Sequence, residues 1–299
     1  MAVAFQSVQT AGPIGRDDGQ KISITKPTST ADGDLLIAHF GIMVRNYSIG
    51  FKMSTLSGWT EINYTQNGKQ SSHVFYKVAG ASEPSTYDWG FDDGTSNVDG
   101  AVTGAIYRIT GQGSVGSIQS SFKAGFSPWD VTLTPTFADS LILMLVTAND
   151  GSADKTGSVS GYAIATDNPT WTERYDVNGN MDTHFGGGDP SQTLIAGATA
   201  SRTEQTATGD ASATIAGYNG EVIAGLVIIP PVVNVTVSGT TGIVELVGND
   251  GSVSGVSNTA GTTGIIELVG NDGVVTTPAQ KWSNVDKSSA PSWNNLDKS

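Results

Sequence analysis

Short runs of apolar and aromatic residues, separated by glycine, aspartate and asparagine, fill the first 231 residues of the chain. Several runs alternate between apolar and polar residues with a period of two, and Leu35–Val44 is apolar almost throughout. No window has the apolar spacing and caps of an amphipathic helix. The pattern therefore predicts an all-β domain, with strands near residues 22–25, 35–44, 59–64, 72–78, 86–91, 101–110, 131–134 and 221–229.

We interpret residues 1–231 as one jelly-roll-like antiparallel β-sandwich with two facing sheets, and two smaller sandwiches are the alternative. The strand order repeats loosely along this region. Trp59-Thr60-Glu61, for example, returns as Trp171-Thr172-Glu173. An internal duplication, with halves near 1–115 and 116–231, explains the echo, and so do two sheets with similar requirements.

The C-terminal part of the chain repeats itself almost letter for letter. Residues 239–251 read GTTGIVELVGNDG and residues 261–273 read GTTGIIELVGNDG, an offset of 22 residues. Each unit predicts a strand followed by an Asn-Asp-Gly turn. Glu245 and Glu267 then take equivalent positions on stacked or successive strands. Copies at a fixed period indicate a structural unit that spans, docks or assembles.

Pro230-Pro231 marks the boundary between the sandwich and this repeat segment, residues 232–279, because proline cannot donate to a sheet ladder. The segment has too few large apolar side chains to bury a core alone. We therefore expect its strands to complete a sheet of the first domain, of an identical subunit or of another protein. The residues expected to make this contact are Ile243, Leu246, Ile265 and Leu268.

The last twenty residues, 280–299, are polar but contain two tryptophans. The motif that begins at Trp282 returns eleven residues later at Trp293. A polar tail without fixed structure is one interpretation. Tryptophan is, however, the residue type most enriched at binding hot spots. We therefore predict that Trp282 and Trp293 insert into pockets of a neighbouring protein and anchor the tail.

Charge and composition exclude several functions. The net charge is −13 and the basic residues are scattered, so binding of nucleic acid through its phosphates is not expected. The chain has no cysteine. Its N-terminus lacks the features of a signal peptide, and its longest apolar run, Val222–Val233, is interrupted by Gly225 and two prolines. Neither classical secretion nor membrane insertion is expected.

Candidate chemistry is sparse. His39 lies in an apolar strand and is interpreted as a core residue, whereas His73 and His184 would form a metal site only if the two halves superposed. Acidic turns resemble fragments of calcium loops, but turn chemistry explains them as well. They are Asp17-Asp18-Gly19, Asp32-Gly33-Asp34, Asp92-Asp93-Gly94, Asn249-Asp250-Gly251 and Asn271-Asp272-Gly273. We predict no catalytic residue, no cofactor and no bound metal.

Two further interpretations concern sugars. Glu61 and Glu173 would form the carboxylate pair of a glycosidase if they flanked one groove. The tryptophans of the sandwich serve either as core residues or as platforms on which sugar rings stack. These tryptophans are Trp59, Trp89, Trp129 and Trp171.

Several segments resemble a β-rich domain found in structural proteins of tailed bacteriophages. They are Ala31–Ala38, Gly58–Thr60, Phe75–Tyr87 and Gly104–Arg108, and the C-terminal Trp-x-Asn-x-Asp-Lys-Ser units look like the ends of virion proteins from marine phages. The resemblance implies a non-enzymatic virion protein made in the host cytoplasm. The expected function is a homo-oligomeric fibre or tail appendage, with host-surface glycans as candidate partners. A capsid decoration protein and a carbohydrate-binding module are the alternatives.

Overall fold

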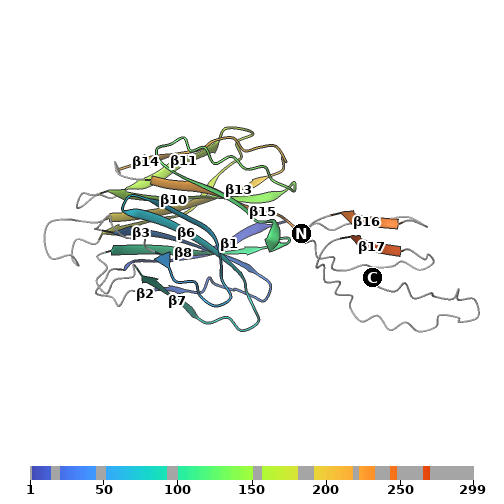
Figure 1. The fold of residues 1–299 in the computed structure, drawn as a ribbon, viewed down its shortest axis with the longest axis horizontal. Helices are drawn as coiled ribbons and strands as arrows, with labels where there is room; N and C mark the ends of the chain where they lie inside the picture. Colours follow the sequence, from blue (N-terminus) through green and yellow to red (C-terminus); the bar gives the residue numbers. More distant parts are fainter. Residues whose placement is uncertain are drawn as a thin grey trace, which may run out of the picture. The chain divides into compact units, whose positions relative to one another are not determined.

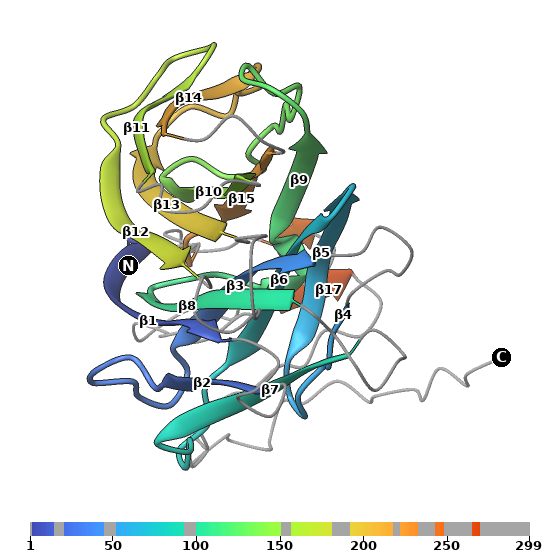
Figure 2. The same cartoon turned by 90° about the vertical axis from the view of Figure 1, so that its left-hand side faces the viewer.

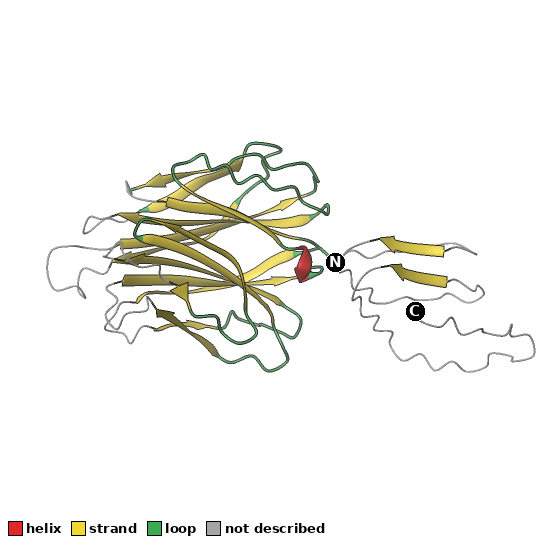
Figure 3. Ribbon diagram, viewed as in Figure 1, coloured by secondary structure: helices red, strands yellow, loops and turns green. Residues whose placement is uncertain are grey.

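The computed structural model describes residues 2–14, 21–44, 52–92, 100–150, 157–180, 192–217, 222–232, 243–247 and 265–269. Strands dominate these residues, and the only helical element among them is a single 3-10 turn, Val115–Ser117 (Figure 3). Residues Met1–Val235 form one compact unit and Thr236–Ser299 form a second. The prediction of an all-β sandwich protein is confirmed.

The first jelly roll comprises the strands β1 to β8. They are β1 (Ala4–Ile14), β2 (Lys21–Thr25), β3 (Leu35–Val44), β4 (Lys52–Met53), β5 (Thr60–Asn67), β6 (Gln70–Val78), β7 (Thr86–Asp92) and β8 (Gly100–Thr110). One antiparallel sheet has the order β1-β8-β3-β6-β5 and the other has the order β2-β7-β4. The chain crosses repeatedly between the two sheets, which is jelly-roll topology.

The second jelly roll comprises the strands β9 to β15. They are β9 (Gln119–Ala124), β10 (Ser140–Asp150), β11 (Ser158–Ile164), β12 (Thr172–Asn180), β13 (Gln192–Arg202), β14 (Ala211–Ala216) and β15 (Val222–Ile229). The large sheet has the order β12-β13-β10-β15-β9, and β11 pairs with β14. Trp129 exchanges two backbone hydrogen bonds with Ala211 of β14 and so takes the place that β2 has in the first jelly roll.

The two jelly rolls have the same strand order and the same local irregularities. Read from β9, the second large sheet runs β9-β15-β10-β13-β12, which matches β1-β8-β3-β6-β5 strand for strand. A register shift follows Glu61 in β5, and another follows Glu173 in β12. Gly33 and Asp139 both have positive φ, two residues before the equivalent Leu35 and Leu141. The shared details indicate a duplicated structural unit.

The two jelly rolls stack through their large sheets into four layers (Figures 1 and 2). One core lies within each jelly roll and a third lies between the two large sheets. The sequence favoured one sandwich over residues 1–231, and the structure has two. Because β3 and β10 are buried on both faces, their sequences are continuously apolar instead of alternating.

The small outer sheets keep the alternation that the large sheets lose. In β2 the residues are alternately exposed and buried. In β7 the aromatic residues Tyr87, Trp89 and Phe91 all face the core of the first jelly roll, as their spacing of two predicts. The pattern of alternation therefore separates outer strands, which have one solvent face, from inner strands, which have none.

Two glycines allow the two large sheets to approach closely. A Cβ atom on Gly41 would lie 2.6 Å from methyl carbons of Ile195 and Thr147, across the central layer. A Cβ atom on Gly197 would overlap the Tyr107 hydroxyl. Since neither overlap can be relieved by a flexible side-chain end alone, the packing of the central layer requires glycine at both positions.

A polar cluster around His39 crosses the otherwise apolar central layer. The Nδ1 atom of His39 lies 2.6 Å from the Tyr175 hydroxyl, and Nε2 lies 3.0 Å from that of Thr147 and 3.3 Å from that of Ser72. Burial, and secondly the nearby His73, lower the pKa of His39 from 6.5 to about 3. The imidazole is therefore neutral at pH 7 and ties the two jelly rolls together, which confirms its interpretation as a satisfied core residue.

Within the segments that carry the phage resemblance, the carboxylates of Asp34 and Glu83 and their partners form a polar cap around the turns before β3 and β7. Asp34 accepts hydrogen bonds from the Ala31 N–H, at 2.7 Å, and from the Arg108 guanidinium, at 2.6 Å. Glu83 accepts hydrogen bonds from Lys77 and Tyr87 at 2.8 and 2.7 Å. Both carboxylates fix turns to strands, so these motif residues are structural in this chain.

In the second unit, strands β16 (Ile243–Val247) and β17 (Ile265–Val269) pair with each other in parallel. The register places Ile243 beside Ile265 and Glu245 beside Glu267, so that each residue pairs with its own equivalent 22 positions later. Parallel pairing needs a connection of about a dozen residues or more, and the repeat period leaves room for it. The strand of one repeat therefore lies directly beside the equivalent strand of the next.

Candidate ligand-binding groove

The structure places some of the residues that the sequence marked as contacts. Ile243 and Leu246 lie on β16, and Ile265 and Leu268 lie on β17, where each pairs through its backbone with the equivalent residue of the other repeat. Their assignment to contacts with a partner stays a prediction. Trp282 and Trp293 lie outside the described residues, as does most of the segment between residues 232 and 279.

The histidines do not converge on a metal site within the described part of the chain. His39 faces the central layer, whereas His73 faces the core side of β6 and pairs with Glu61. His184 lies outside the described residues. No group of three or more histidine, aspartate or glutamate side chains is close enough to hold a metal among the residues that are described. The acidic turn that is described in full, Asp32-Gly33-Asp34, uses Asp34 in the polar cap.

A Ser-His-Glu line occurs on β5 and β6, although no sequence motif marks it. His73 Nδ1 lies 2.8 Å from a Glu61 carboxylate oxygen, and its Nε2 lies 3.4 Å from the Ser71 hydroxyl. This order matches that of a hydrolase triad. Ser71 and His73 are, however, 2% and 1% exposed, so the serine hydroxyl is enclosed by the fold. The line acts as a hydrogen-bond network in which the exposed Glu61 carboxylate satisfies the buried His73 and Ser71 behind it.

The two glutamates considered as a glycosidase pair do not meet. Glu61 lies on β5 and Glu173 lies on β12, the equivalent strand of the other jelly roll. In the stack of large sheets, β1 packs beside β12 and β5 packs beside β9. The strands β5 and β12 therefore occupy opposite edges of the stack. The two carboxylates cannot flank one glycosidic bond, because that requires a separation below about 10 Å.

A groove of about 400 Å³ does lie beside Trp171 in the second jelly roll. It is lined by residues of β11, of the loop after it and of the start of β12, namely Ser160, Gly161, Tyr162, Asn168, Pro169, Trp171 and Glu173. The Trp171 indole N–H donates to the Asn168 side-chain oxygen at 2.9 Å, which fixes the orientation of the ring. Burial, and secondly the carboxylate of Asp176, raise the pKa of Glu173.

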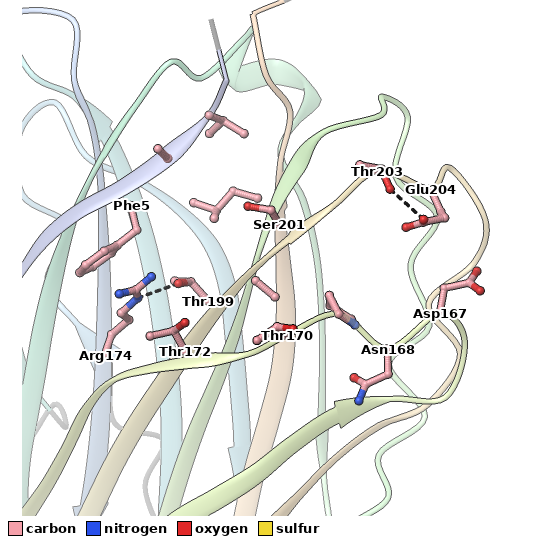
Figure 4. A pocket seen from close by; sticks show the side chains of 15 residues that line it. Phe5, Asp167, Asn168, Thr170, Thr172, Arg174, Thr199, Ser201, Thr203 and Glu204 are labelled. Carbon is pink, nitrogen blue, oxygen red and sulfur yellow. Dashed lines mark hydrogen bonds between the residues drawn. The ribbon is translucent and has the colours of Figure 1, made fainter.

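A larger depression of about 680 Å³ adjoins this groove, because Asn168 and Pro169 line both. Figure 4 shows the depression between β1 and the loop that contains Asp167. The Arg174 guanidinium lies 4.0 Å from the centre of the Phe5 ring and donates to the Thr199 hydroxyl at 2.7 Å. The groove and the depression thus form one open surface. It carries an aromatic ring, amide and hydroxyl groups, and carboxylates.

The sequence contained one signal for this groove, which was the Trp-Thr-Glu motif at Trp171. The motif alone could not separate a core tryptophan from a surface tryptophan, because Trp59 has the same neighbours. Trp59, Trp89 and Trp129 are buried in the cores, whereas Trp171 is only partly buried. The loop residues Asn168 and Pro169 carried no sequence signal.

Comparison of the chain with protein-family models, with curated proteins and with solved structures finds no match. Among the residues that the structure describes, no helix has the length and apolar character that a membrane crossing requires.

Proposed function

We propose that this protein is a structural component of a bacteriophage virion, a fibre or tail appendage that assembles as a homo-oligomer and contacts host-surface glycans. The observation that carries the proposal is the in-register parallel pairing of β16 and β17. Repeat structures of this kind bury their surfaces by stacking and need about three or more units for stability. This chain contains two such units.

A second copy of the chain supplies the missing units in this proposal. Both outer edges of the two-stranded sheet carry backbone groups of a sequence that already pairs with itself in parallel. An identical strand from another copy therefore finds the same register at that edge. Symmetric homo-oligomers are the common way in which such self-complementary segments are satisfied.

A location in the virion is supported by the resemblance to structural proteins of tailed bacteriophages. The segments that carry this resemblance are Ala31–Ala38, Gly58–Thr60, Phe75–Tyr87 and Gly104–Arg108. A carbohydrate-binding module outside a virion is the second candidate, and the groove beside Trp171 favours it. A capsid decoration protein shares the assembly argument but needs no groove. Protein mass spectrometry of purified particles separates these functions. Tens of copies or fewer indicate a tail part, hundreds indicate a capsid decoration, and absence from particles excludes both.

Proline substitution tests the assembly step in the full chain. Proline at Leu246 and Leu268 removes a backbone donor from each repeat strand, so L246P/L268P is expected to abolish the oligomer. The matched control, L246V/L268V, keeps strand propensity and is expected to keep the oligomer. Light scattering after size-exclusion chromatography measures the mass, and circular dichroism checks that the jelly rolls remain folded. A monomeric wild-type chain, or a proline variant that still assembles, would contradict the proposal.

A further inference from the structure

The Trp171 ring is held in place before any ligand arrives. The Asn168 side-chain oxygen accepts the indole N–H and also the backbone N–H of Ile164, at 2.9 and 3.0 Å. Trp171 is partly buried against the core of the second jelly roll, and the Tyr162 ring centre lies 6.4 Å from that of Trp171. A ring fixed in this way loses little conformational entropy on binding.

Hydrogen-bonding groups surround this ring at the level of the groove. Glu173 is exposed, lies two residues after Trp171 and lines the same groove. The side-chain oxygen of Asn168 is already engaged, so its amide nitrogen remains as a donor toward the groove. An aromatic face flanked by an acceptor and a donor suits a ligand with a flat apolar face and hydroxyl groups at its edge.

The first jelly roll shows how the same motif looks when it is used for structure alone. The equivalent tryptophan, Trp59, is 5% exposed and packs edge-on against Tyr87 and Trp89, with ring centres 5.3 and 5.0 Å away. The equivalent carboxylate, Glu61, is held by His73 at 2.8 Å. Both groups are occupied in the first jelly roll, whereas both line the groove in the second.

The charges along the groove and its neighbouring depression are mainly negative. Three carboxylates line them, those of Asp167, Glu173 and Glu204, against the Arg174 guanidinium, and the buried Arg202 guanidinium lies 3.7 Å from the Asp167 carboxylate, so the local balance stays negative. The Arg174 guanidinium is engaged by the Phe5 ring and by the Thr199 hydroxyl. An anionic ligand would meet this excess of negative charge without a cation dedicated to it.

We propose that the groove binds an uncharged glycan. A pyranose ring stacks on Trp171, its hydroxyls donate to the Glu173 carboxylate, and the Asn168 amide donates to a sugar oxygen. Further sugar units of the glycan continue into the depression lined by Asp167 and Thr170. This inference rests on the proposed contact with host-surface glycans and names the class of sugar that makes it. Sialylated, sulfated and uronic-acid glycans are expected to bind more weakly, because the carboxylates along the groove repel them.

A glycan array probed with the full-length protein tests the proposal, followed by calorimetry with the best neutral oligosaccharide. Trp171→Ala is expected to weaken binding at least tenfold, and Glu173→Gln severalfold. The matched control is Phe126→Ala, which removes an aromatic side chain that is 82% exposed from a loop outside the groove. It is expected to leave binding unchanged. Thermal unfolding of each variant checks that the fold is retained.

The outcomes separate this inference from the virion proposal. Preference for acidic glycans, no binding to any glycan, or equal binding by wild type and Trp171→Ala would each overturn the groove proposal. The number of copies in purified particles and the oligomeric state test the virion proposal independently. A protein that assembles into particles but binds no glycan would refute the groove and the glycan contact, and would leave the virion location and the homo-oligomer standing. A protein that binds neutral glycans but is absent from particles would refute only the virion location.

Discussion

The two jelly rolls use equivalent positions for different purposes. In the first, Trp59 belongs to the core and Glu61 is paired with His73, whereas in the second Trp171 and Glu173 line an open groove. The strand order, the register shift after each glutamate and the turn before each central strand are the same. The scaffold therefore tolerates divergence where a strand meets a loop, while the strand order of the stacked large sheets is the same in both jelly rolls.

The largest expected effect is the difference in stability lost when the tryptophan of each jelly roll, Trp59 or Trp171, is replaced by alanine. Trp59→Ala should lower the free energy of unfolding by about 3–5 kcal/mol, because it leaves a cavity among Tyr87 and Trp89. Trp171→Ala should lower it by about 1 kcal/mol, because part of the ring is already exposed. Chemical denaturation of both variants measures the contrast. Equal losses would show that the groove tryptophan is a core residue after all.

The next effect concerns His39, whose equivalent in the second jelly roll is Leu145. The unfolded chain binds a proton on this histidine below pH 6.5, but the folded protein does so only near pH 3. Stability contributed by the neutral imidazole is therefore complete above pH 6.5 and is lost as the pH falls. The loss is about 1.4 kcal/mol per pH unit, or about 3 kcal/mol by pH 4.

His39→Leu should remove this component of the pH dependence, although it also leaves the hydroxyls of Thr147 and Tyr175 without their partner. Tyr175→Phe is the control, because it removes one hydrogen bond but keeps the titrating group. The free energy of unfolding, measured at pH 7 and pH 4, gives the pH dependence of stability for each variant. The assignment fails if His39→Leu has the same pH dependence as the wild type.

The smallest effect is expected from the central contact between the jelly rolls. Gly41→Ala should destabilise the protein by about 1–3 kcal/mol, because the new methyl group meets Ile195 and Thr147 at 2.6 Å. Gly80→Ala is the control, since its Cβ would meet no atom closer than the Glu83 carboxylate at 3.7 Å. Thermal unfolding compares the two. A similar change in both would mean that the sheets can move apart at little cost.

The alternation of polar and apolar residues predicted the strands of the first jelly roll well. The expected segments 22–25, 35–44, 86–91 and 101–110 coincide with β2, β3, β7 and β8 to within one residue. Others were not marked, among them β1 and β13. The strand β1 is half-buried along most of its length, and β13 is rich in alanine and glycine. A period of two is therefore weak in β1, and β13 has few of the β-branched and aromatic residues by which strands are recognised.

The number of sandwiches could not be read from the sequence. Two facing sheets and four stacked sheets both require buried strands, and an apolar run such as that of β10 does not reveal what covers its second face. The echo of Trp59-Thr60-Glu61 suggested a duplication. Only the matching sheet orders made it visible as two jelly rolls.

Local periodicity and turn chemistry were enough to predict an all-β chain, the position of most strands of the first jelly roll and the C-terminal repeat. Tertiary structure decided which tryptophan is open, which glutamate is paired and that the repeats lie side by side in parallel. Those properties depend on contacts between residues far apart in the chain. Local pattern cannot encode which of two identical motifs a distant loop will cover.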